Sequence, residues 1–175
     1  MEHGVVIIRL ATASDAATIA CVHVETWRRT YRRQMPDSVL DGLDAKFTPK
    51  SWVKLLQASE STTFVADVEK EIIGFCSLMP SRDPEADKKI IAEIAAINIS
   101  PRHWRKGAGR KLCEHAIAEA QSNGFSSLTL WVLETNHAAR KFYVAIGFAL
   151  DGGQKTIAMG GVDLLEVRYR LTLLH

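Results

Sequence analysis

The chain has 175 residues, of which 47% are hydrophobic and 24% charged, and its formal net charge is +2. This length suits one core, so we expect a single domain over residues 1–175. The small net charge argues against nucleic acid as a partner. No apolar run reaches the length of a membrane span, and the first ten residues lack the basic start of a signal peptide. We therefore expect a cytoplasmic protein with no membrane partner.

The three cysteines, Cys21, Cys76 and Cys113, are widely spaced and form no Cys-x-x-Cys pair. An odd number with this spacing excludes a disulfide framework and argues against a zinc site. Each lies in an apolar stretch, so we expect three small buried side chains and no bound metal.

The first half of the chain reads as one strand followed by helices. A β-branched run predicts a strand over 5–10. Ser14 and Asp15 are typical of a helix N-cap, and apolar residues at helical spacing continue to about Tyr31. Two shorter helical pieces are predicted over 36–40 and 49–56.

From residue 62 onwards the pattern changes to strands alternating with helices. A hairpin is predicted over 63–78, and a charged loop over 80–89 precedes a strand over 90–99. The remaining predicted elements are a helix over 107–121, a strand over 127–133, a helix over 136–146, a last strand over 164–173 and one further short strand near 155–159. This order predicts an α/β fold with a mixed sheet.

The segment 97–112 joins a strand to a helix through a basic turn and the pair Gly107 and Gly109. The first amides of a helix have no internal partner, and the helix dipole adds positive potential, so the junction can bind an anion. Three other interpretations remain open at this point. The glycines could allow close helix packing, and the charges could form a solvated face. The basic cluster could also contact nucleic acid, but no aromatic stacking platform accompanies it.

The stretch 104–109 resembles motif A of the GNAT N-acetyltransferase superfamily, in which Gln/Arg-x-x-Gly-x-Gly/Ala holds the pyrophosphate of acetyl-CoA through backbone amides. Trp104 departs from the pattern, because Gln or Arg is usual there. The resemblance implies acetyl-CoA as cosubstrate and a GNAT-type sheet with splayed central strands. It also implies a set of cofactor-binding residues: Arg105, Lys106, Gly107, Ala108, Gly109 and Arg110.

The stretch 130–148 resembles motif B of the same family. By that resemblance Tyr143 donates a proton to the departing thiolate, and Asn136 contacts the pantetheine arm. Asn136 also suits a helix N-cap. A half-buried core tyrosine is the alternative for Tyr143.

The strand over 90–99 stands where the family has its central strand, so Ile97 and Ile99 are expected to offer main-chain hydrogen bonds to the cofactor. Glu93 is the one carboxylate in this apolar strand and could act as the general base, directly or through water. The alternative places Glu93 at the strand start, facing solvent and balancing Lys88 or Lys89.

The acceptor is expected between the first helices and the late strands, where Trp27 and Tyr31 could form an aromatic wall or could pack the helix on the sheet. The implied activity is direct transfer of an acetyl group to a primary amine of a small molecule, peptide or protein. A homodimer is left open. Two other functions remain possible: a CoA-binding module without turnover, and a nucleotide-binding protein that uses the Gly107 helix.

Overall fold

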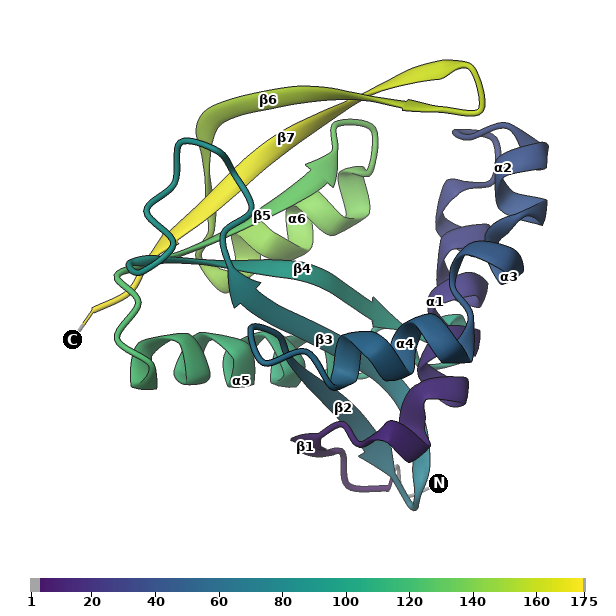
Figure 1. The fold of residues 1–175 in the computed structure, drawn as a ribbon, viewed down its shortest axis with the longest axis horizontal. Helices are drawn as coiled ribbons and strands as arrows, with labels where there is room; N and C mark the ends of the chain where they lie inside the picture. Colours follow the sequence, from purple (N-terminus) through teal and green to yellow (C-terminus); the bar gives the residue numbers. More distant parts are fainter. Residues whose placement is uncertain (1–3, 175) are drawn as a thin grey trace.

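The computed structural model describes residues 4–174, through which one seven-stranded sheet runs (Figure 1). In chain order the elements are β1 (Ile7–Leu10), η1 (Ala13–Asp15), α1 (Ala16–Tyr31), α2 (Asp37–Asp41), α3 (Leu43–Lys46), α4 (Pro49–Leu56), β2 (Thr62–Val68), β3 (Glu71–Pro80), β4 (Ile91–Ile99), η2 (Pro101–His103), α5 (Ala108–Ser122), β5 (Ser127–Leu133), α6 (His137–Ile146), β6 (Ala149–Met159) and β7 (Val162–Thr172). The predicted α/β class is confirmed.

The sheet has the strand order β1-β2-β3-β4-β5-β7-β6. Every neighbouring pair is antiparallel except β4 and β5, which run parallel. The helix α5 makes the crossover between these two strands, as a parallel pair requires. The sheet is therefore mixed, as predicted.

The two central strands separate along their length (Figure 1). β4 is nine residues long, but it pairs with β5 at Ile91, Ala92 and Glu93 alone. On its other edge β4 pairs with β3 as far as Ile99, with a bulge that leaves Ala95 without a partner. The predicted splay is thus confirmed, and the second half of β4 has one edge without a strand neighbour.

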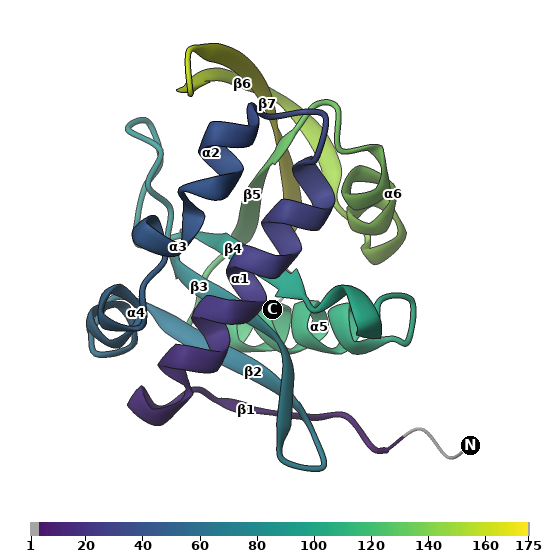
Figure 2. The same cartoon turned by 90° about the vertical axis from the view of Figure 1, so that its right-hand side faces the viewer.

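Helices cover both faces of the sheet. α5 packs on β2, β3 and β4 and shares its apolar cluster with α6, whereas α1 packs on β3 and β4 together with α4. Figure 2 shows α1 crossing in front of the central strands, with α5 and α6 to one side. The opening between β4 and β5 consequently lies between two helical layers.

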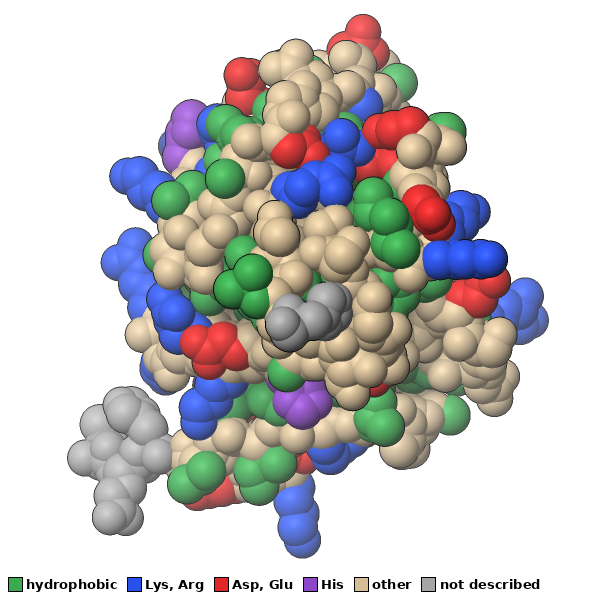
Figure 3. All heavy atoms as spheres, turned by 90° about the vertical axis from the view of Figure 1, so that its left-hand side faces the viewer, with side chains coloured by type: hydrophobic (Ala, Val, Ile, Leu, Met, Phe, Trp, Pro, Cys, Tyr) green, Lys and Arg blue, Asp and Glu red, His purple; other side chains and the backbone are tan. Residues whose placement is uncertain are grey.

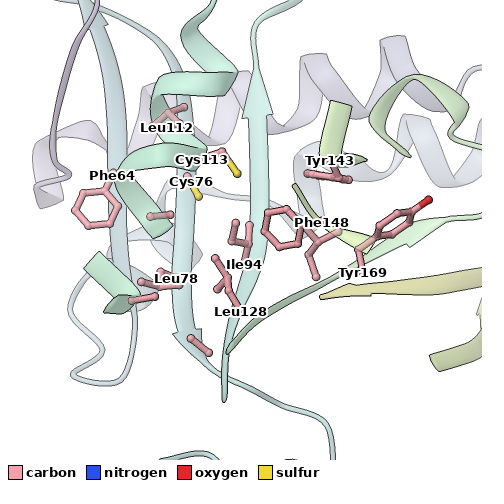
Figure 4. Close-up of a cluster of buried hydrophobic side chains, with 14 of the residues drawn as sticks. Phe64, Cys76, Leu78, Ile94, Leu112, Cys113, Leu128, Tyr143, Phe148 and Tyr169 are labelled. Atoms are coloured by element: carbon pink, nitrogen blue, oxygen red, sulfur yellow. The ribbon is translucent and has the colours of Figure 1, made fainter. Parts of the chain in front are cut away.

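The largest core cluster fills the α5 side of the sheet (Figure 4). Leu112 and Cys113 of α5 meet Cys76 of β3 and Leu128 of β5, each 0% exposed. Tyr143 of α6 belongs to the same cluster. The buried residues of α5 repeat at helical spacing and form one apolar stripe, which packs the helix on the strands.

Some expectations were wrong in detail. Asp15 is the N-cap residue of α1, as predicted, but a turn η1 precedes it and begins at Thr12, whose backbone N–H donates to the Asp15 carboxylate at 2.7 Å in a capping box. The short strand expected near 155–159 is an eleven-residue strand, β6. Cys21 is exposed on α1, because its position points away from the sheet, while Cys76 and Cys113 are buried as expected.

The surface carries both signs of charge. On the face shown in Figure 3, basic and acidic side chains are interspersed rather than gathered by sign. Among residues 4–174, no helix combines the length and apolar character needed to cross a bilayer.

Candidate active site

The open edge of β4 presents the backbone groups of two isoleucines. The N–H of Ser100 donates to the Ile73 carbonyl of β3 at 2.8 Å, so the backbone of Ser100 faces β3. Because backbone groups alternate along a strand, those of Ile97 and Ile99 face away from β3, towards the opening. The structure therefore places both predicted residues where an added chain could pair with them.

The carbonyl of Ile99 is already in use. It accepts a hydrogen bond from the Thr26 hydroxyl of α1 at 3.2 Å and another from the Trp104 indole N–H at 2.6 Å. A carbonyl oxygen has two lone pairs, so a further donor would have to displace one of these bonds. Trp104 is 40% exposed and Thr26 is 8% exposed, so Trp104 is the partner that can leave.

The start of α5 lies beside this edge. Gly107 is its N-cap residue, with φ at 86°, and no side chain caps the helix. The left-handed conformation accounts for glycine at 107. A Cβ on Gly109 would lie 3.5 Å from Phe142 and 3.6 Å from Ile99, which is ordinary contact. Tight packing therefore does not require glycine at 109, and the first amides of α5 remain available to an anion.

Basic side chains surround this helix start. Arg105 and Lys106 are exposed, and Arg105 takes a left-handed φ of 61° just before Gly107. Arg110 forms a 3.4 Å ion pair with Glu114 and extends to the Ala145 carbonyl. The predicted cofactor residues 105–110 thus form one continuous turn and helix start, with Ala108 buried beneath it at 1% exposure.

Tyr143 lies inside the apolar cluster, 8% exposed, between Phe142, Phe148 and Tyr169 (Figure 4). Burial raises the pKa of Tyr143 well above its ordinary value, and the neighbouring Cys113 adds to the rise. The phenol consequently stays protonated at neutral pH. None of the hydrogen bonds found among residues 4–174 involves its hydroxyl, so its proton is available to an outside acceptor.

Tyr31 connects the first helix to the second motif. Burial raises the pKa of Tyr31, and a hydrogen bond with the Asn136 side chain opposes that rise. Asn136 caps α6 by accepting from the Ala139 N–H at 3.2 Å, which confirms its predicted role as N-cap. Trp27 meets Tyr31 edge to face at 5.2 Å, and both pack against the cluster that contains Leu133. The two aromatic residues therefore do pack the helix, and Tyr31 is also close to Asn136.

Glu93 is 1% exposed, so the solvent-facing alternative is wrong. Its partner is Arg82 in the loop before β4, not Lys88 or Lys89. The Arg82 backbone N–H donates to Oε2 at 2.9 Å, and the guanidinium donates to Oε1 at 2.6 Å. Ala92 and Ile94 point to the α5 face, so Glu93 lies on the opposite face of the sheet.

His137 is exposed in the first turn of α6. Sequence reasoning missed three contacts of the site: Arg82 with Glu93, Trp104 with Ile99, and Tyr31 with Asn136. Only Trp104 had given a signal, as the departure from motif A. The structure brings together an unpaired strand edge, an uncapped helix start and a protonated phenol, which can hold an extended anionic molecule and protonate a leaving group.

A sheet that opens between two parallel central strands, with an uncapped helix start at the opening, can bind an extended anionic ligand. The profile described as the acetyltransferase (GNAT) family matches residues 24–148. The chain therefore belongs to the GNAT acetyltransferase family.

Two similar sequences are N-acetyltransferases of Bacillus subtilis that carry no assigned substrate. YuaI is 35% identical over 132 residues, covering 75% of this chain and 73% of YuaI. YhfO is 33% identical over 146 residues, covering 83% of this chain and 91% of YhfO.

Solved structures share the fold at lower identity. The PaiA N-acetyltransferase of Thermoplasma acidophilum, in complex with coenzyme A, superposes with a TM-score of 0.78 at 19% identity over 96% of this chain and 99% of that one. The structure of YncA of Salmonella typhimurium, described as an acetyltransferase with its cofactor acetyl-CoA, superposes with a TM-score of 0.70 at 20% identity. The match covers 98% of this chain and 95% of YncA. The architecture deduced from the strand pairing is therefore that of these enzymes.

Proposed function

We propose that the chain transfers the acetyl group of acetyl-CoA directly to a primary amine of a small molecule or peptide, in the cytoplasm. The observation that carries the proposal is the open edge of β4, which ends at the uncapped start of α5. The complexes of PaiA with coenzyme A and of YncA with acetyl-CoA support the choice of cosubstrate.

The residues present fit such a cosubstrate. The amides of Ala108, Gly109 and Arg110 suit a pyrophosphate, because they have no capping side chain and stand at the positive end of a fifteen-residue helix. The outward backbone groups of Ile97 and Ile99 suit an amide-containing arm, which would pair with β4 as an added strand does. Trp104 must then release the Ile99 carbonyl.

In the proposed reaction Tyr31 and Trp27 border the acceptor, whose neutral amine attacks the thioester carbonyl. A C–N bond forms, the C–S bond breaks, and the nitrogen gives up one proton. Glu93 takes that proton, directly or through water. Tyr143 donates its phenolic proton to the departing sulfur. The unpaired stretch of β4 at Ala95 supplies backbone polarity where β5 departs, which can stabilise the developing oxyanion.

Glu93 can serve as base only if Arg82 gives way. Both carboxylate oxygens now accept hydrogen bonds from Arg82. The Arg82 side chain is 57% exposed, so the guanidinium can turn to solvent. Arg82 thus has the geometry to hold Glu93 ready until the acceptor enters.

Acetyl-CoA binding is tested with two substitutions at one position. Gly109→Glu puts a carboxylate into the anion site, whereas Gly109→Ala adds a methyl group that the structure accommodates. We expect acetyl-CoA to stabilise the wild type and Gly109→Ala to heat, by about 2.7 kcal/mol at a hundred times the dissociation constant. Folded Gly109→Glu should show no shift, and an equal shift in all three proteins would refute this site.

Turnover is tested by thiol release with a panel of amines. Acetylated amine among the products supports the enzyme. Tight CoA binding without thiol release for any amine would instead identify a CoA-binding module. Displacement of CoA by ATP would favour a general nucleotide site.

A further inference from the structure

A hollow of about 660 Å³ lies beside the turn that joins α1 to α2. Its far side is formed by the start of β7, in the hairpin that reaches across to α2 in Figure 1. The hollow opens to solvent and is lined by Arg32, Arg33, Gln34, Met35, Pro36, Asp37 and Val162.

The turn that carries the arginines is fixed to the candidate active site. Gln34 donates to the Thr30 carbonyl at 3.1 Å and accepts from the Thr135 hydroxyl at 2.7 Å. Thr135 immediately precedes Asn136, the N-cap residue of α6, and Tyr31 immediately precedes Arg32. The hollow therefore begins one residue beyond the aromatic pair that borders the proposed acceptor site.

The tip of the β6–β7 hairpin holds the other side in place. Gly160 packs against Val39 and Pro36 so closely that a Cβ would collide with the Val39 side chain. This contact joins the hairpin to α2, and the two elements lie near each other in Figure 2. The space is thus bounded by two segments that pack on each other, rather than by free loops.

The charge in the hollow is positive. Arg32 and Arg33 are exposed, and within residues 4–174 neither forms an ion pair; Asp37 is the one carboxylate in the lining. Exposed Asp163 follows Val162 in β7, outside the lining. Two carboxylates of the adjoining helices α1 and α3 have partners of their own. Asp44 pairs with Arg28 at 2.6 Å, and Glu25 accepts from the Ser100 hydroxyl at 3.1 Å.

Arg33 stands at a backbone position that does not favour a side chain. Its φ is 73°, in the left-handed region that glycine and asparagine adopt at lower cost. The turn itself therefore gives no reason for arginine. Residues in this conformation are enriched at functional sites, although Glu69 and Lys70 also adopt it in the turn between β2 and β3.

We propose that this hollow is an anion subsite for the acceptor, so that the preferred amine also carries a carboxylate or phosphate in the same small molecule. The proposal rests on the proposed transferase function. Arg32 and Arg33 hold the anionic group by charge-assisted hydrogen bonds, while the amine extends past Tyr31 to the opening in the sheet. Polyamines without an anionic group are repelled by the same charges.

The test compares matched amines at fixed acetyl-CoA. The pairs are an amino acid with its amide, and phosphoethanolamine with ethanolamine; spermidine is the cationic arm. We expect kcat/KM to be at least about tenfold higher for the anionic member of a pair. A preference in one pair alone would show whether carboxylate or phosphate is taken, and equal values in both pairs would overturn the proposal.

Substitutions locate the preference. Arg33→Gln should lower the anionic-to-neutral ratio by about ten- to a hundredfold, mainly through KM. Arg33→Gly should do the same without lowering thermal stability, because glycine relieves the left-handed backbone. Arg29→Gln, at an exposed arginine of α1 outside the lining, is the matched control and should leave the ratio unchanged. A ratio that survives both Arg33 variants overturns the assignment to this hollow.

A failure of the proposed transferase function can be distinguished from a failure of the proposed anion subsite. If acetyl-CoA binds but no amine is turned over, the proposed function fails. Calorimetric titration of the same amines into CoA-loaded wild type and CoA-loaded Arg33→Gln then tests the subsite separately. The subsite proposal requires that the anionic amines bind more tightly to the wild type than to Arg33→Gln.

Discussion

Removing the hydroxyl of Tyr143 separates catalysis from packing. Tyr143→Phe keeps the ring and its edge-to-face contacts with Phe142 and Phe148, at 5.4 and 6.1 Å. The substitution removes only the proton proposed for the leaving thiolate. We expect kcat to fall by about a hundredfold to ten-thousandfold, or about 3 to 5 kcal/mol in the barrier.

The expected effect on folding stability follows from the hydrogen bonds. Within the described residues the Tyr143 hydroxyl has no partner, so its loss leaves no group unsatisfied. Removing an unpaired, largely buried hydroxyl is neutral or slightly stabilising. The free energy of unfolding should therefore stay within about 0.5 kcal/mol of the wild type.

Tyr169→Phe is the matched control in the same cluster, with its ring centroid 6.3 Å from that of Tyr143. The Tyr169 hydroxyl accepts from the Arg140 guanidinium at 3.1 Å. Its removal should cost about 1 to 3 kcal/mol of stability, because a charged donor loses its acceptor, and should leave kcat within about twofold. Tyr143→Phe is thus expected to lower kcat and leave folding stability unchanged, whereas Tyr169→Phe is expected to lower folding stability and leave kcat unchanged.

Steady-state thiol release and urea unfolding measure the two quantities on the same preparations. Because burial raises the pKa of Tyr143, its titration should add no alkaline limb to the wild-type rate near neutral pH. Turnover of Tyr143→Phe within about twofold of the wild type, which lies far outside the range for a general acid, would refute the assignment.

Three further predictions concern Trp104, Glu93 and His23. Trp104→Phe frees one lone pair of the Ile99 carbonyl, so the Kd for acetyl-CoA measured by calorimetry should tighten by about two- to tenfold; weaker binding would show that the indole helps to hold the cofactor. Glu93→Gln should lower kcat about a hundredfold and flatten the acidic limb of the pH–rate profile, and an unchanged limb would leave Glu93 as a loop anchor for Arg82. Burial lowers the pKa of His23 from 6.5 to about 4, so the unfolded chain takes up the proton first. Stability should therefore fall by about 3 kcal/mol as pH drops from 6.5 towards 4, and His23→Phe should remove that slope in acid titrations followed by circular dichroism.

The sequence predicted elements best where local signals mark both ends. The helix over 49–56 and the strand over 127–133 have the predicted bounds; Pro49 lies in the first helical turn and Thr48 caps it at 3.1 Å. The start of β6 was missed because residues 149–154 are almost all exposed and include two adjacent glycines. Its pairing with β7 supplies the order that its own sequence lacks.

In the candidate site, too, the features set by neighbouring residues could be predicted, and the contacts between distant residues could not. Asn136 bonds a backbone N–H three residues further on, so its capping position could be predicted, and the start of α5 at the glycine pair could be predicted to within one residue. The contacts of Glu93 with Arg82 and of Ile99 with Thr26 join residues 11 and 73 positions apart. Such pairs follow from strand register and helix placement, which the chain fixes only when it folds.

The placement of the proposed acid and base on opposite faces of the sheet favours direct transfer. Tyr143 belongs to the cluster on the α5 face, whereas Glu93 points to the other face, and the gap between β4 and β5 joins the two sides. An acceptor entering beside α1 would therefore meet the base, and the sulfur would leave towards the acid. A covalent acetyl-cysteine would need a reactive thiolate near the gap. Burial raises the pKa of Cys113 to about 12 and that of Cys76 well above its ordinary value, so both remain protonated thiols at neutral pH and are poor nucleophiles.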